Sequence, residues 1–117
     1  YHFELHTHSG GVIFHWQSLI RALLLDHQAG VSPGVLSARF HRAVVELMQM
    51  AVSVLYQQTG CTTVVLSGGV FQNDYLLEQG LQTLRKQGYL VYSNEKIPAN
   101  DGGIAFGQAA AASHRMR

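Results

Sequence analysis

The chain of 117 residues is poor in the features that mark several protein classes. It contains one cysteine, Cys61, so an intramolecular disulfide framework is excluded. We interpret Cys61 as a small hydrophobic residue, and a single cysteine is consistent with a reducing cytoplasm. No apolar run approaches the roughly 20 residues that a membrane-spanning helix needs, and no basic-then-apolar leader opens the sequence. We therefore expect a cytoplasmic protein without a membrane partner.

Charge is also scarce. Only 13% of the residues are Asp, Glu, Lys or Arg, compared with about a quarter in typical soluble domains, whereas 47% are hydrophobic. The eight basic residues are scattered and the net charge is +1, which argues against a nucleic-acid partner. Because the sequence starts at Tyr1 in a strand-like segment, we expect a fragment whose apolar surface contacts the remainder of a longer polypeptide. Self-association of the fragment is a second hypothesis.

The hydrophobic pattern predicts an α/β fold. Residues 1–6 and 12–15 are expected to pair as a β-hairpin around a glycine turn. Two helices are expected next, one ending at Gly30 and one running from Ser32 and Pro33 to Gly60, the second buried on more than one side. The remainder alternates strands and helices, and residues 62–66 have the β-branched, apolar composition of a strand inside a parallel sheet. Without a repeat or linker, residues 1–117 are treated as one unit.

The most informative features are two glycine turns about thirty residues apart, each between a strand-like and a helix-like segment. The first is Ser67-Gly68-Gly69-Val70-Phe71-Gln72-Asn73, where backbone N–H groups and the Asn73 amide are expected to contact a phosphate or ribose oxygen. The alternative is a tight turn in which glycine serves sterics alone. The first turn is not a P-loop, because no Gly-Lys-Ser or Gly-Lys-Thr follows.

The second turn is Asn100-Asp101-Gly102-Gly103. Asp101 stands at the expected start of a helix, where the helix dipole stabilises a carboxylate that can bind a divalent cation. Gly102 and Gly103 allow a ligand to approach the backbone without interference from a Cβ atom. The alternative is that Asp101 only caps the helix and that Gly103 and Gly107 serve close helix packing. Together, the two turns suggest one nucleotide-type site.

The seven histidines permit a separate metal hypothesis. His2, His6 and His8 share strand parity, and His15 is expected to face them across the hairpin, so the group has the chemistry of a zinc or nickel site. The alternative is a set of exposed edge-strand histidines without a ligand.

The two glycine motifs resemble one known family. Residues 64–73 and 97–109, at this spacing, are similar to the C-terminal end of the HypF-type hydrogenase-maturation carbamoyltransferases. Gly30-Val31-Ser32-Pro33 and Ala38-Arg39-Phe40-His41 resemble the helical segments that precede the first turn in that family. The likeness covers nearly the whole chain after the opening hairpin. It implies the second half of a domain of the actin-like ATPase (ribonuclease H-like) superfamily.

The resemblance also implies a reaction. Enzymes of this type use carbamoyl phosphate and ATP to form carbamoyl-adenylate, then transfer the carbamoyl group to the C-terminal cysteine of the partner HypE for cyanide ligand synthesis. By position, Asp101 matches the aspartate that binds the divalent metal, whether iron, zinc or magnesium. Asn73 matches the asparagine that contacts the nucleotide, and Gly68 and Gly69 match the turn beside its phosphate and ribose.

The matched family places a histidine pair, which supplies the other metal ligands, in the first half of the domain. We therefore predict that the chain alone is inactive. Threonylcarbamoyl transfer to tRNA and O-carbamoyl transfer use the same fold and similar turns, and they stay open as alternatives. A noncatalytic α/β module that binds another protein through an apolar face is a third.

Overall fold

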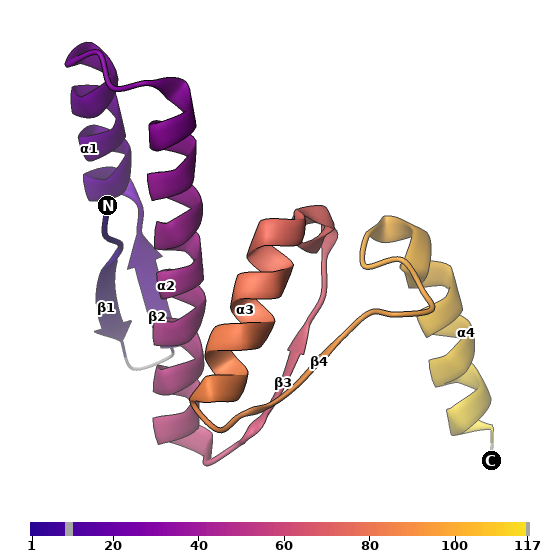
Figure 1. Cartoon of the computed structure of the whole chain (residues 1–117). Helices are drawn as coiled ribbons and strands as arrows, with labels where there is room; N and C mark the ends of the chain where they lie inside the picture. The colour runs from indigo at the N-terminus through magenta and orange to yellow at the C-terminus, as the bar shows by residue number, and fades with distance from the viewer. Residues whose placement is uncertain (9–10, 117) are drawn as a thin grey trace. The chain divides into compact units, whose positions relative to one another are not determined.

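The computed structural model describes residues 1–8 and 11–116, without the side chains of Thr7 and His8 (Figure 1). Contacts divide the chain into two units, Tyr1–Ala51 and Val52–Arg117. Each unit is described by itself below. Within the described residues, no helix has both the length and the apolar character that crossing a membrane requires.

The first unit begins with the predicted hairpin. Strand β1 (Glu4–His8) pairs antiparallel with β2 (Gly11–His15), with Leu5 opposite Phe14, and the turn residues Ser9 and Gly10 lie outside the described part. Helix α1 (Gln17–Gln28) follows, and Gly30 ends it with a positive φ of 78°. A left-handed residue of this kind is favourable for glycine because it has no Cβ atom.

Helix α2 (Pro33–Thr59) starts at the predicted proline, where a missing N–H costs nothing, and ends before Gly60 at a φ of 69°. Burial of this helix is less extensive than the sequence predicts. Leu36, Ala43 and Val45 are buried, but Leu55 is 54% exposed. The apolar stripe is present in the sequence, but it is only partly covered toward the C-terminal end of the helix.

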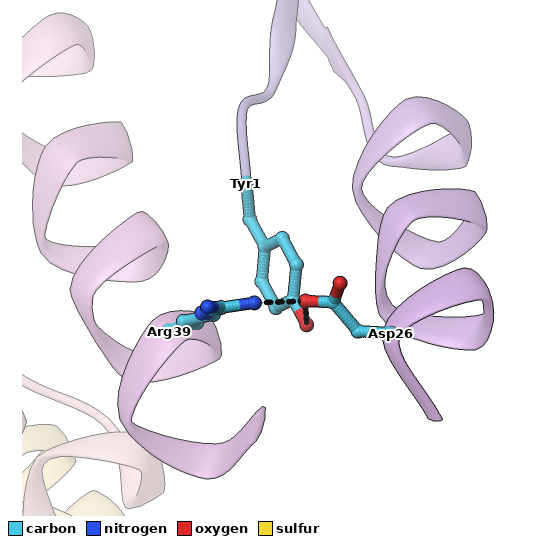
Figure 2. A network of polar contacts seen from close by, with 3 residues as sticks. All are labelled: Tyr1, Asp26 and Arg39. Atoms are coloured by element: carbon cyan, nitrogen blue, oxygen red, sulfur yellow. Dashed lines mark hydrogen bonds and ion pairs between the residues drawn. The ribbon is translucent and has the colours of Figure 1, made fainter. Parts of the chain in front are cut away.

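A polar network joins three segments of the first unit, and Figure 2 shows its three side chains converging. The Tyr1 hydroxyl donates a hydrogen bond of 2.7 Å to Asp26 Oδ2, and Arg39 Nη1 donates to the same oxygen. These contacts lower the pKa of Asp26 below its ordinary value of 3.8, first through the Tyr1 hydrogen bond and then through Arg39. The sequence gives no local signal for this network, because its members are 13 and 25 residues apart.

The network predicts a pH dependence of stability. Because the pKa of Asp26 is lowered in the folded chain, its contribution is present above the ordinary value of 3.8 and is lost as the pH falls through the lowered pKa. Asp26→Asn is therefore expected to flatten the decline in the free energy of unfolding at acidic pH. Urea unfolding of both chains from about pH 2 to pH 6 measures this slope. Equal slopes for the two chains would contradict the prediction.

The second unit contains a parallel pair of strands and a covering helix. Strand β3 (Thr63–Leu66) pairs with β4 (Leu90–Ser93), and helix α3 (Asp74–Lys86) packs against β4, as Figure 1 shows. The core of this unit is aliphatic and consists of Leu66, Leu76, Leu84 and Val91. Two 3₁₀ turns, η1 (Gly69–Gln72) and η2 (Asp101–Gly103), precede α3 and the last helix, α4 (Ile104–Arg115).

The sheet is covered on one face only. Val65 pairs with Tyr92 and Thr63 with Leu90, so these four residues share the face opposite to buried Leu66 and Val91. Val65 is 65% exposed and Leu90 is 54% exposed. Strand β3, which was predicted to lie inside a parallel sheet, is therefore in a parallel pair, but only one of its two faces is covered. A two-stranded sheet with one helix has no second layer for its outer face.

Candidate functional site

The first glycine turn follows β3 directly. Gly68 adopts φ 109° and ψ 159°, a conformation that residues with a Cβ atom rarely adopt, and it leads into η1. Asn73 then caps α3, because its side-chain oxygen accepts a hydrogen bond of 3.1 Å from the Leu76 N–H. The side-chain oxygen of Asn73 is therefore used within the fold.

The second turn is capped by Asn100. Its side-chain oxygen accepts a hydrogen bond of 3.0 Å from the Gly102 N–H. The sequence alternative in which Asp101 is the helix cap is therefore wrong. The cap lies one residue earlier, because an Asn side chain folds back readily onto the N–H two residues on. Asp101 is exposed, and its carboxylate is not used for capping.

The two turns meet in space. The Gly68 N–H donates a hydrogen bond of 2.9 Å to the carbonyl oxygen of Ala99, which joins the first turn to the loop before the second. A hollow of about 460 Å³ lies at this junction. From the predicted turns, its lining includes Ser67, Gly68, Asn100, Asp101 and Gly103. The expectation of a shared site thus has a geometric basis, namely one cavity lined by both turns.

Several predicted residues lie outside this lining. Gly69 begins η1, Asn73 caps α3, and Gly102 contacts the Asn100 side chain, and none of the three lines the hollow. Other residues also line it, and they are Asn94, Ile97, Pro98, Ala99, Ile104, Phe106 and Gly107. All of them except Asn94 belong to the 97–109 motif, but the sequence did not assign them to the site, because their place depends on how this segment folds back toward Gly68.

Backbone donors are also fewer than the sequence predicts. The N–H groups of Gly68, Gly102 and Gly103 donate to Ala99 O, Asn100 Oδ1 and Asn100 O, respectively. They are therefore not available to hold a phosphate while these bonds persist. The role left to these glycines is steric, since a residue without a Cβ atom lets a ligand or another backbone approach closely.

Gly103 shows such a close approach. A Cβ atom at this position would lie 2.5 Å from the carbonyl oxygen of Pro98 and 3.1 Å from Ile97 Cγ2. Gly107 differs, because an added Cβ atom there would meet nothing within 4 Å. Of the two glycines predicted to serve close packing, Gly103 therefore has a close neighbour among the described residues and Gly107 has none. Helix α4 has no buried residue, since no neighbour in the described part covers it.

The described residues do not supply a complete metal centre. Among the residues that the structure describes, no group of three or more His, Cys, Asp and Glu side chains is placed to hold a metal ion. The exposed carboxylate of Asp101 has the chemistry of one ligand for a divalent cation, but a single carboxylate does not fix a metal against water. No reaction step through a metal follows from these residues alone.

The predicted histidine group is divided by the structure. The rings of His6 and His15 lie side by side, with centroids 4.5 Å apart. His2 instead lines a separate hollow with Tyr1 and Arg39, and the side chain of His8 lies outside the described residues.

Comparison with known proteins decides the family. Residues 1–108 match the family model described as "Carbamoyltransferase, Kae1-like Domain, second subdomain". The chain belongs to this carbamoyltransferase family. Its fold is accordingly a mixed α/β, Kae1-like subdomain, in which the hairpin comes first and helices follow.

Proteins similar to the chain carry the HypF name. It is 33% identical over 93 residues to carbamoyltransferase HypF of Synechocystis sp., covering 80% of this chain and 11% of that protein. It is 37% identical over 79 residues to carbamoyltransferase HypF2 of Cupriavidus necator, covering 68% of this chain and 10% of that protein. The HypF-like chain therefore spans about a tenth of the length of these curated relatives.

A solved structure agrees with the family. The HypF-like chain matches the crystal structure of full-length HypF in the phosphate- and nucleotide-bound form with a TM-score of 0.94 and 36% identity. The match covers all of this chain and 15% of the HypF chain. The resemblance inferred from the two glycine motifs is thereby confirmed.

Proposed function

We propose that the chain is the part of a HypF carbamoyl-transfer domain that lines one side of its nucleotide site. The reaction is the use of carbamoyl phosphate and ATP, by way of carbamoyl-adenylate, to carbamoylate the C-terminal cysteine of HypE. The observation that carries the proposal is the hydrogen bond from Gly68 to Ala99, which brings both glycine turns to one hollow. The bound nucleotide and phosphate of the solved HypF relative support this assignment.

The proposal assigns a separate role to each group of residues in the two turns. Gly68 and Gly103 line the hollow and permit close approach of the nucleotide. Gly69, Asn73 and Gly102 lie outside the lining, and they are assigned to the same nucleotide site only by their places in the two motifs. Asp101 presents its exposed carboxylate at the rim of the hollow as one ligand of the divalent metal. A metal bound there would supply Lewis-acid polarisation of the carbamoyl carbonyl. The remaining ligands are assigned to the rest of the polypeptide.

The partner we propose for the exposed β3–β4 face is also the rest of the polypeptide. This face carries Val65, Leu90 and Tyr92, each more than half exposed. Uncovered apolar surface of this kind marks a contact site in larger proteins. A concentration-dependent dimer of the separate chain would instead support self-association.

A reconstitution experiment tests the proposed function. The chain replaces the matching segment of the Synechocystis HypF, and HypE with its C-terminal cysteine is incubated with the product, carbamoyl phosphate and ATP. We expect mass spectrometry to show one carbamoyl group on that cysteine, and none when the chain is supplied alone. Transfer by the chain alone contradicts the incomplete-site prediction. Transfer of threonylcarbamoyl to tRNA in place of HypE modification supports the alternative enzyme class.

A further inference from the structure

The exposed face of the hairpin gathers metal-ligating side chains that the proposed carbamoyl transfer does not use. Glu4 pairs with His15, and His6 pairs with Ile13, so the register places all four residues on one face. His6 and Glu4 are exposed and His15 is partly buried. This arrangement brings two imidazoles and one carboxylate from two strands to the same surface.

The two imidazole rings are in contact. Their centroids are 4.5 Å apart and their planes are tilted by 59°. The planes of a stacked pair would be nearly parallel, whereas a tilted pair permits one nitrogen from each ring to face a shared point. Neutral imidazole nitrogen is a ligand preferred by Zn²⁺, Cu²⁺ and Ni²⁺.

We propose that His6 and His15 form a bidentate binding site for a borderline divalent cation such as Zn²⁺. The described residues contain no group of three or more ligands placed to hold a metal ion, so the two imidazoles would be the protein ligands and water would complete the coordination. Glu4, opposite His15, adds negative charge beside the ion. The class of ligand is a transition-metal cation, not a phosphate or nucleotide.

Binding at this position has a structural consequence. A two-stranded hairpin is marginally stable by itself, and a cation held by one histidine from each strand links β1 to β2. Because the ion binds the paired strands and not the separated ones, it stabilises the hairpin by mass action. The site thus couples metal occupancy to the pairing of β1 with β2.

The test is titration of the chain with Zn²⁺, followed by calorimetry and by the imidazole NMR signals of the histidines. We expect one cation per chain and shifts confined to His6 and His15. His6→Asn and His15→Asn are each expected to weaken binding at least about tenfold, the lower end of the loss seen when a supporting group of a metal site is removed. His27→Asn, an exposed histidine in the last turn of α1, is the matched control and keeps wild-type affinity.

A second pair of variants separates ligation from ring packing. His6→Phe and His15→Phe retain an aromatic pair but remove the nitrogen, so both are expected to fold and to lose the site. Circular dichroism of each variant establishes that it is folded before titration. The proposal is overturned if either phenylalanine variant binds Zn²⁺ as tightly as wild type, or if the folded wild-type chain shows no saturable binding.

Discussion

Replacing Asp101 with alanine in a full-length HypF that carries this subdomain is expected to abolish carbamoyl transfer and leave the fold intact. The carboxylate lines the hollow between the two turns and is exposed, so its loss removes a proposed metal ligand without emptying a core. We expect at least about a 100-fold loss of rate, comparable to removing one electrostatic contact from a transition state. The rate of HypE carbamoylation and the free energy of unfolding are the two measurements.

The cap at Asn100 makes this experiment interpretable. Since Asn100 and not Asp101 accepts the Gly102 N–H, Asp101→Ala removes no cap, whereas Asn100→Ala is expected to cost about 1 kcal/mol of stability. Asp74→Ala, which removes another exposed carboxylate from a first helical turn, is the matched control and retains activity. Full activity of the Asp101→Ala enzyme would exclude Asp101 as a metal ligand. Asp101→Asn keeps the shape of the side chain and removes its negative charge, so it tests whether activity depends on the charge.

Gly103→Ala is expected to destabilise the second unit and distort the hollow. An added Cβ atom would meet the Pro98 carbonyl oxygen at 2.5 Å, and a backbone atom gives way less easily than a flexible side chain. Overpacking of this kind costs about 1–3 kcal/mol. Because Gly103 also bonds to Asn100 through its N–H, the strain passes directly to the second turn. Urea unfolding of the chain and nucleotide affinity of the full-length enzyme measure the two effects.

Gly107→Ala is the matched control for the unfolding measurement only, since the same chemical change occurs four residues away and Gly107 also lines the hollow. No atom lies within 4 Å of the added Cβ atom, and the residue is in the interior of helix α4. Alanine is therefore expected to raise the free energy of unfolding by about 0.5–1 kcal/mol. Equal stability changes in the two variants would show that the contact with Pro98 does not constrain the turn.

The order and type of the elements could be predicted because the signals are local. Gly30 and Gly60 have positive φ where the sequence predicts helix ends, and α2 starts at the predicted Pro33. Each of these features depends on a few neighbouring residues and on backbone sterics. The family resemblance was likewise carried by two short motifs.

The candidate site was predictable only in outline. The sequence predicts that both glycine turns contribute to one site, and the hollow is lined by residues from each. It did not predict that the Gly68 N–H is taken by Ala99 or that Phe106 lines the cavity. These features join segments about thirty residues apart, and the way such segments meet depends on how the helix and strand between them pack.

By itself, the sequence determined the α/β element order, the helix ends and the family, because capping, glycine conformation and hydrophobic period act over a few residues. Tertiary structure decided which groups meet. In the folded chain, Asn100 and not Asp101 accepts the capping hydrogen bond. Gly103 lies close to the Pro98 carbonyl group, and the rings of His6 and His15 are in contact. The tertiary structure also leaves one face of the β3–β4 sheet exposed. Contacts between distant segments depend on the path of the whole chain, which no local pattern specifies.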